Sequence, residues 1–453
     1  MCAAVGYAML LTSCADRSNI SDRPSPHDGR PNVILLLVDT LRADHLSCYG
    51  WSRATSPMVD AFAADSVLFE RARSQAACTF PSVNSMLTSR YGSLFMFQPN
   101  HFMGIPANVP ALPQVLRSNG YATAAFSASP IVRATPSSEN PDAGFGRGFD
   151  VFDEACLFLD AGCLRSRAVR WVDGIEPPFF LYMHFMETHD PYAPPGNHTR
   201  RFAGEFDGAD HIGKGDPNPI ADMVYNDGPQ VAVSDRDLRH LLDLYDEEIA
   251  YFDEQFKLLM DELSLLGVLD NSLVILTSDH GEEFMEHGNH IKHCRVLYDT
   301  STRVPIIMRI PDVPGRRVDT AVGNVDIMPT VLDYVGISYG EIPLNGRSLR
   351  PLIEGTESGG RVVFSDQGRW RAADDGDFKL MLDAVEVRSE LFDLEADPLE
   401  RSDILPSQSE VGHRLWQELE RWLIATEGAV GSRKALDAGE ETQERLRAVG
   451  YLQ

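Results

Sequence analysis

The 453-residue sequence has few basic residues for its length, with 40 Lys and Arg against 67 Asp and Glu and a formal net charge of -27. This deficit excludes non-specific attraction to nucleic acid and to anionic membrane surfaces, so neither is expected as a partner. The same charge would repel an anionic ligand at long range. Binding such a ligand therefore requires local positive charge, such as a metal ion, at its site.

Three other features are missing from the sequence. It has no Cys-x-x-Cys pair of the kind found in zinc ribbons, no internal repeat, and no apolar run beyond the N-terminal segment that is long enough to span a bilayer. Hydrophobic residues make up 43% of the chain, which is too many for wholesale disorder. The length suits one large α/β domain with an appendage, or two to three smaller units.

The N-terminal residues resemble a bacterial lipoprotein signal, expected to cover residues 1–14. The motif Leu11-Thr12-Ser13-Cys14 follows a short apolar run and implies cleavage before Cys14, with a lipid attached to that residue. An extracytoplasmic lipoprotein, bound to a membrane only through this lipid, is therefore expected. No Lys or Arg precedes the apolar run, so an upstream start or a disordered tail stays open, and a tail would leave the protein cytoplasmic. Polar residues 15–30 read as a linker.

Loss of Cys2 and lipidation of Cys14 would leave five of the seven cysteines, so one thiol must stay free in a monomer. Cys156 and Cys163 are close enough in sequence to form a local disulfide in an oxidising compartment, and buried free thiols are the open alternative.

Three mostly apolar runs, at residues 33–38, 179–186 and 273–277, predict central strands of a parallel sheet covered on both faces. Between the second and third, apolar residues from 241 to 266 recur every three or four positions, which predicts a long helix ended by Gly267. A strand, a helix and a strand in this order form a parallel crossover.

Weaker patterns complete the expected organisation. They predict helices at 112–119 and 326–334, strands at 122–127 and 303–310, an insertion or lid at 203–234, and, beyond a linker at 355–360, strands near 362–364, 378–381 and 390–394 with a helix near 411–426. We therefore expect a large α/β domain at 31–355 and a C-terminal α+β subdomain with a tail at 356–453.

Polar residues follow the predicted strands where open α/β sheets bind ligands. Asp39 follows the first strand, and Asp279 and His280 follow the third. Pro81 suits a first helical turn, so Thr79 is expected at the N-terminal end of a helix. Free backbone N–H groups at that end can hold an oxyanion. Helix capping is the alternative role for Asp39 and Thr79.

These four residues form a candidate metal site. Oxygen and nitrogen ligands together suit Mn²⁺ or Zn²⁺, whereas Ca²⁺ and Mg²⁺ prefer all-oxygen shells. One such ion would lower the pKa of the Thr79 hydroxyl, creating a nucleophile, and would neutralise charge on a sulfuryl or phosphoryl group.

Histidines in two loops are candidates for contacting a substrate. His189 follows the second strand, and His287, His290 and His293 lie close together after the third. The last three lack regular ligand spacing on a helix, so we favour one functional histidine and two solvated loop residues over a separate zinc site. His189 and His293 could bind substrate oxygens or protonate a leaving group.

Several segments stand out as ordered motifs: residues 32–44, 81–82 with 87–90, 277–282, 297–299 with 303–305, and 390–398. Together they resemble the sulfatase family of the alkaline phosphatase superfamily over roughly residues 31–395. The resemblance implies an alkaline-phosphatase-like α/β sandwich with a large, mixed, mostly parallel sheet and a small C-terminal α+β subdomain. It also implies metal binding by Asp39, Asp279 and His280, a nucleophile two residues before Pro81, and substrate contacts from His189 and His293.

The sequence departs from the family pattern at three points. Many sulfatases have paired aspartates where this chain has Asp39-Thr40, and the formylglycine motif has Cys or Ser two residues before the proline and Arg two after it. Here those two positions are Thr79 and Val83, and Cys78 lies one residue too early. An esterified threonine cannot collapse to an aldehyde, so its group must be released by attack at sulfur or phosphorus.

We therefore expect a metal-dependent hydrolase of sulfate or phosphate esters with a threonine nucleophile, acting on anionic small-molecule or glycan esters. The threonine is also similar to that of phosphotransferases such as lipoteichoic acid synthases, which usually carry transmembrane helices. A phosphoryl transferase is accordingly the first alternative. A non-catalytic binding protein that keeps the fold is the second.

Overall fold

The computed structural model describes residues 29–92, 104–157, 160–195, 201–204, 233–288 and 291–430. The lipoprotein motif, most of the linker at 15–30, most of the insertion at 203–234, His290 and the C-terminal tail lie outside these ranges. Over the described ranges, no helix combines the length and the hydropathy needed to cross a bilayer.

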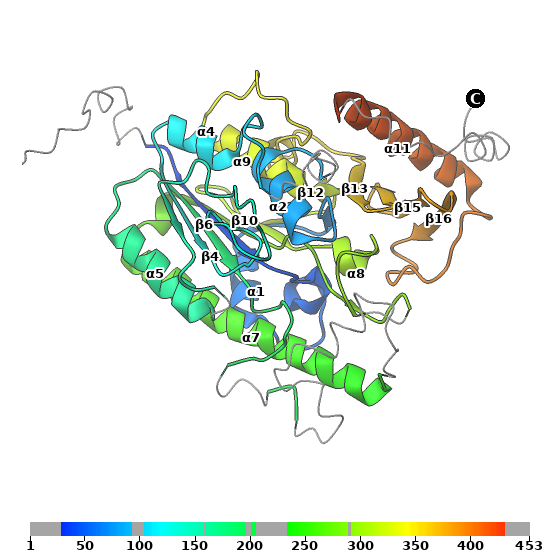
Figure 1. Ribbon diagram of the computed structural model, residues 1–453, viewed down its shortest axis with the longest axis horizontal. Coiled ribbons are helices and arrows are strands. Elements are labelled where there is room, and N and C mark those ends of the chain that lie inside the picture. The colour runs from blue at the N-terminus through cyan, green and yellow to red at the C-terminus, as the bar shows by residue number, and fades with distance from the viewer. Residues whose placement is uncertain are drawn as a thin grey trace, which may run out of the picture.

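An eight-stranded sheet forms the centre of the molecule (Figure 1). Its strands lie in the order β11 (Arg316–Val318), β2 (Val67–Phe69), β10 (Ile306–Arg309), β7 (Ser272–Thr277), β1 (Asn32–Val38), β6 (Phe179–Phe185), β4 (Ala122–Ser127) and β5 (Val151–Asp153). β1 runs parallel to both β6 and β7, whereas β10 is antiparallel to β7 and β2. The sheet is therefore mixed and mostly parallel, as the sequence predicted.

Helices cover both faces of this sheet. The longer elements are α1 (Pro57–Ala64), α2 (Thr79–Thr88), α4 (Leu112–Ser118), α5 (Ala161–Asp173), α7 (Asp235–Leu265) and α9 (Ile327–Tyr334), with short helices α8 (Asp299–Thr302) and α10 (Arg350–Ile353). Among the described residues, 3₁₀ turns lie at Ala43–His45, Ser47–Tyr49, Leu269–Asn271 and Asn324–Asp326. In Figure 1, α5 and α7 run along one face, and α2, α4 and α9 lie on the other.

The apolar run of β1 explains why this strand is central. Ile34, Leu36 and Val38 pack into the core under α1, α5 and α7, whereas the alternate residues pack under α2, α4 and α9. Successive strand side chains point to opposite faces, and because both faces of β1 are covered, residues 33–38 are all apolar.

A second, antiparallel sheet packs with α11 (Ser409–Val430). It contains β13 (Val363–Gln367), β14 (Trp370–Asp374), β15 (Phe378–Asp383) and β16 (Arg388–Asp393) in that order. The sequence analysis missed β14, whose residues include Arg371 and Asp374 and form no continuous apolar run. Two small sheets pair β3 (Ala72–Arg73) with β12 (Val322–Gly323) and β8 (Glu283–Phe284) with β9 (Ile291–Lys292).

Two disulfides are formed in the described chain. Cys156 pairs with Cys163, the pairing that the sequence left open against free thiols. Cys78 pairs with Cys294, which the sequence analysis did not foresee. Cys48 is the free thiol among the described cysteines.

Candidate functional site

Three parallel strands bring the candidate ligands to one edge of the central sheet. Leu37 of β1 lies level with Thr277 of β7 and with His184 of β6. Asp39 and Asp279 each lie two residues further along the chain, just beyond the carboxyl ends of the adjacent strands β1 and β7. One ligand atom from each of Asp39, Asp279 and His184 can be chosen so that all three lie within 4.8 Å of one another.

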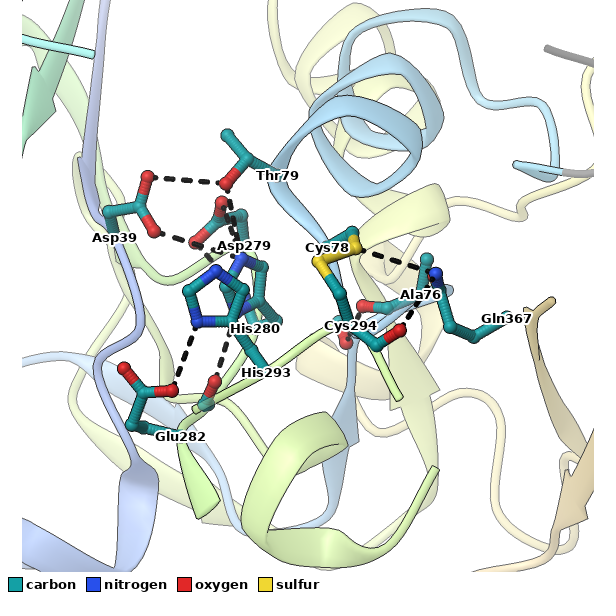
Figure 2. The surroundings of a disulfide bond; sticks show 12 residues. Asp39, Ala76, Cys78, Thr79, Asp279, His280, Glu282, His293, Cys294 and Gln367 are labelled. Atoms are coloured by element: carbon teal, nitrogen blue, oxygen red, sulfur yellow. Dashed lines mark hydrogen bonds and ion pairs between the residues drawn. A yellow bond between two sulfur atoms is a disulfide. The ribbon is translucent and has the colours of Figure 1, made fainter. Parts of the chain in front are cut away.

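Thr79 faces this cluster from the first residue of α2 (Figure 2). Its Oγ1 lies 3.2 Å from His280 Nε2 and 3.4 Å from Asp39 Oδ2. Cys78, not Thr79, is the residue that precedes the helix as its N-cap, so the capping role considered for Thr79 is wrong. Ser82 fixes the start of α2 to the end of β7 by donating a hydrogen bond to the Asp279 carbonyl over 2.5 Å.

The two carboxylates retain free oxygens that suit a cation. Asp39 Oδ1 and Asp279 Oδ2 are buried and accept no hydrogen bond from the described residues. Burial raises the pKa of Asp279, and the nearby charge of Asp39 raises it further. For Asp39, burial is outweighed by the hydrogen bond with His184 and by nearby imidazoles, which hold its pKa below the ordinary value. Buried like charges with unpaired oxygens are the chemistry expected of a metal site.

His280 presents an unprotonated nitrogen to the same point. Its Nδ1 lies 2.9 Å from the Gly281 carbonyl, which can only accept, so Nδ1 carries the ring proton. Burial lowers the pKa of His280, which favours the neutral ring. Nε2 is therefore free to bind a metal or to accept a hydrogen bond from Thr79.

His184 is the residue that the sequence analysis missed. Its Nε2 lies 3.1 Å from Asp39 Oδ2, and its Nδ1 lies 2.9 Å from the Tyr182 hydroxyl. Its one sequence signal was an imidazole near the carboxyl end of an otherwise apolar strand. Thr40, at the position of the second aspartate in many sulfatases, instead donates to the Thr188 carbonyl over 2.5 Å and has a left-handed φ of 59°.

His189 and His293 lie beside the cluster. Their ring centroids are 5.1 Å apart, and the His293 ring lies 4.5 Å from that of His280. His293 Nδ1 is 3.0 Å from Glu282 Oε1, and the other Glu282 oxygen accepts from the Tyr192 hydroxyl over 3.0 Å. Burial lowers the pKa of His293, but Glu282 outweighs it and raises the pKa to about 9. The Glu282 carboxylate therefore favours the protonated form of the His293 ring.

His287 does not belong to this group. Its side chain is buried, its Nδ1 lies 3.1 Å from Glu283 Oε1, and its ring stacks on Tyr298. The expectation of a solvated loop histidine is therefore wrong for His287, which packs against the segment preceding α8.

A sequence profile described as Sulfatase matches residues 31–337 of the chain. The chain belongs to the sulfatase family. A second profile, described as N-sulphoglucosamine sulphohydrolase, C-terminal, matches residues 285–425. The sulfatase resemblance seen in the sequence motifs is thus confirmed.

This sulfatase-family chain is similar to several characterised proteins. It is 28% identical to a choline-sulfatase from Rhizobium meliloti over 56% of this chain and 51% of that protein, so it spans about half the length of this relative. It is 23% identical to an N-acetylglucosamine-6-O-sulfatase from Bacteroides thetaiotaomicron over 77% of this chain and 74% of the relative. These relatives support the prediction of an ester hydrolase.

Solved structures agree on the fold. The phosphonate monoester hydrolase of Agrobacterium radiobacter superposes with a TM-score of 0.70 at 22% identity, covering 88% of this chain and 96% of that one. A 2-O glycosaminoglycan sulfatase, BT1596, superposes with a TM-score of 0.67 at 20% identity, covering 88% and 93%. The alkaline-phosphatase-like architecture expected from the sequence is confirmed. Sulfatase-family enzymes use a metal ion, and the Asp39, His184 and Asp279 cluster could hold one.

Within this sulfatase-family chain, Cys78 cannot replace the missing formylglycine residue. Its sulfur is bonded to Cys294, so it is not available as a free thiol. Val83, at the position of the motif arginine, is buried in the core beneath α2. Thr79 is thus the motif residue whose hydroxyl contacts the carboxylate and imidazole cluster.

Proposed function

We propose that the protein is a metal-dependent hydrolase of sulfate or phosphate esters in which Thr79 is the nucleophile. The observation that carries this proposal is the position of Thr79 Oγ1, 3.2 Å from His280 Nε2 and 3.4 Å from Asp39 Oδ2. A threonine hydroxyl is a weak nucleophile at its ordinary pKa and needs such neighbours to be activated. Residues 31–355 would form the catalytic domain and residues 356–453 the C-terminal subdomain and tail.

Four side chains would hold one divalent ion: Asp39, His184, Asp279 and His280. For His184 Nε2 to bind the ion, its ring proton would lie on Nδ1, where the Tyr182 hydroxyl oxygen can accept it in a hydrogen bond. Two imidazoles beside two carboxylates favour Mn²⁺ or Zn²⁺ over Ca²⁺ or Mg²⁺. When bound, the ion would lower the pKa of the Thr79 hydroxyl and withdraw charge from the ester oxygens. Asp39 Oδ2, 3.4 Å from Thr79 Oγ1, would accept a hydrogen bond from the hydroxyl and orient it for attack.

The two loop histidines would act on the substrate. Glu282 keeps His293 protonated at neutral pH, so its ring can bind an anionic ester oxygen or donate a proton to the leaving group. His189, 5.1 Å away, would contact the same group. The His293 cation supplies local positive charge of the kind that a chain with a net charge of -27 needs to bind an anion.

The substrate class follows from the chemistry and the relatives together. A threonine ester must be released by attack at sulfur or phosphorus, and in-line displacement at metal-held phosphorus is a well-supported route. The phosphonate monoester hydrolase similarity supports phosphorus, whereas choline-sulfatase and N-acetylglucosamine-6-O-sulfatase support sulfate. We therefore propose anionic small-molecule or glycan esters of either acid.

Hydroxyl substitutions test the nucleophile. With Mn²⁺ or Zn²⁺ bound, Thr79→Val should lower kcat on aryl sulfate and aryl phosphate by at least about 1,000-fold, whereas Thr79→Ser should retain much of the activity. Thr88→Val, on the same helix, is the matched control and should leave kcat unchanged. Accurate-mass analysis of the peptide containing Thr79 after quenching should show a sulfuryl or phosphoryl adduct. Full activity of Thr79→Val would rule out this nucleophile.

A phosphoryl transferase is the second candidate, because a threonine rather than formylglycine nucleophile is present. Product analysis with glycerol as an acceptor separates the two reactions. Phosphoglycerol as the main product would establish transfer, whereas free phosphate or sulfate would establish hydrolysis.

We also propose that the protein acts outside the cytoplasm, anchored by a lipid at Cys14. Disulfides persist mainly in oxidising compartments, and the two bonds Cys78–Cys294 and Cys156–Cys163 support export. Metabolic labelling with a fatty acid, compared between the natural chain and Cys14→Ser, tests the anchor. Equal labelling of both proteins would contradict it.

A further inference from the structure

The Cys78–Cys294 disulfide lies directly beside the proposed reaction centre. Cys78 immediately precedes Thr79, and Cys294 immediately follows His293, although the two cysteines are 216 positions apart in sequence. Figure 2 shows the bond joining the mouth of α2 to the chain segment that carries His293. Thr79 and His293 both face His280, so the bond links the two segments that would meet the substrate from different directions.

Other interactions also fix the chain next to His293: β9 pairs with β8, and His293 Nδ1 lies 3.0 Å from Glu282 Oε1. The disulfide acts on the following residue, where the remaining contacts are hydrogen bonds. The Cys294 amide donates to the Ala77 carbonyl over 2.7 Å, and Gln367 Nε2 donates to Cys78 Sγ and to the Cys294 carbonyl, each over 3.4 Å. Cys294 has a φ of 71°, a left-handed conformation that is unfavourable for a residue with a Cβ atom. The bond and these contacts thus hold the segment in a conformation that Cys294 would not adopt freely.

We propose that the Cys78–Cys294 disulfide is a positioning element for catalysis, which fixes the distance and orientation of His293 relative to the Thr79 hydroxyl. This inference rests on the proposed roles of Thr79 and His293. The sulfurs do not touch the substrate. They act by fixing the residues on either side of the reaction centre.

The size of the expected effect follows from the geometry of group transfer. A misplacement of about 1 Å between reacting groups costs on the order of 100-fold in rate, even when every group is still present. Loss of the bond should therefore lower kcat at least about tenfold while KM changes by less than about threefold. The proposed metal ligands lie on β6 and in the residues directly after β1 and β7, so metal content should not change.

Cysteine variants test this proposal with an internal control. Cys78→Ser with Cys294→Ser removes the bond beside Thr79, and Cys156→Ser with Cys163→Ser removes the bond that joins α5 to the segment before it. We expect the kcat loss in the first pair only. Equal kcat values in the two folded double variants would overturn the proposal, as would alkylation of Cys78 or Cys294 in the untreated native protein.

The bond closes a long loop, so its removal by mutation could prevent folding. Reduction of the folded Cys156→Ser, Cys163→Ser protein avoids this problem, because Cys78–Cys294 is then the described disulfide that remains. Reduction transfers two electrons and two protons from dithiothreitol to the Cys78–Cys294 bond, and dithiothreitol becomes a cyclic disulfide. Peptide mass spectrometry then counts the thiols formed. Amides of residues 291–298 should exchange hydrogen faster after reduction, and reoxidation should restore both protection and kcat.

Hydrogen exchange and kcat together distinguish the positioning role of the disulfide from the proposed hydrolase function. Faster exchange with an unchanged kcat would overturn the positioning role and leave the hydrolase intact. An oxidised, metal-loaded protein with no activity would instead refute the proposed function. If hydrogen exchange in residues 291–298 also stayed unchanged on reduction, the claim that the disulfide fixes the His293 segment would be overturned.

Discussion

His184 Nε2 lies 3.1 Å from Asp39 Oδ2, although the two residues are 145 positions apart in sequence. Because β1 and β6 are parallel neighbours, both side chains reach the same edge of the sheet. Thr40 stands where many sulfatases have a second aspartate, and the His184 imidazole lies beside the remaining carboxylate, that of Asp39. As a ligand of the proposed ion, the His184 nitrogen would favour Mn²⁺ or Zn²⁺ over Ca²⁺.

Replacing His184 should therefore weaken metal binding. We expect His184→Asn to lower the affinity for Zn²⁺ at least about tenfold, measured by competition with a chromophoric chelator. His240→Asn, on α7, is the control and should bind Zn²⁺ as the natural protein does. Equal affinities for His184→Asn and the control would exclude His184 from the metal site.

Removal of the Glu282 charge should change the titration of His293. The pKa of His293 is raised from 6.5 to about 9 by Glu282, against an opposing effect of burial. In Glu282→Gln the burial effect remains, so the pKa should fall below 9 and the ring should lose its proton at lower pH. NMR titration of the histidine rings in chelator-treated protein measures this shift, and an unchanged midpoint would contradict the assignment.

Glu187 should make stability depend on pH. Burial raises its pKa from 4.5 to about 7, and its Oε2 accepts no hydrogen bond from the described residues. The native state then binds the proton more tightly than the unfolded state, so stability falls as pH rises from 4.5 to about 7 and is level above it. Glu187→Gln should remove this loss of about 3 kcal/mol.

Urea denaturation between pH 4 and pH 8 measures the difference for Glu187→Gln. The stability advantage of the variant should grow through this interval, because only the natural protein must ionise a buried carboxyl group. The exposed Glu176→Gln variant should show no such trend. Parallel curves for natural protein and Glu187→Gln would contradict the prediction.

Lys379 should contribute strongly to stability. Its buried Nζ lies 2.9 Å from Asp299 Oδ1 and 2.9 Å from Glu400 Oε1, joining β15 of the second sheet to α8. Lys379→Met would leave two buried carboxylates without this cation, which should cost about 3–5 kcal/mol. The exposed pair of Lys257 with Asp261 on α7 is the comparison, and Lys257→Met should cost less than about 1 kcal/mol. Denaturant unfolding that gives equal losses would contradict this prediction.

Much of the fold was readable from hydrophobic patterns. The buried runs became β1, β6 and β7, and the long periodic segment became α7 with Gly267 in a left-handed conformation after its end. The missed strand β14 shows the limit of this approach. Its residue Asp374 is satisfied by a partner distant in sequence, Arg73, whose Nε donates to Asp374 Oδ2 over 2.8 Å.

The sequence by itself determined that Asp39, Asp279 and His280 meet, because parallel strands end at a common edge and these residues follow adjacent apolar runs. Pro81 likewise predicted that Thr79 lies at the N-terminal end of a helix. Only the tertiary structure decided that His184 contacts Asp39, that Glu282 charges His293, and that Cys78 bonds to Cys294. These relationships depend on which loops and strands pack side by side, and disulfide connectivity does not follow from cysteine spacing over such separations.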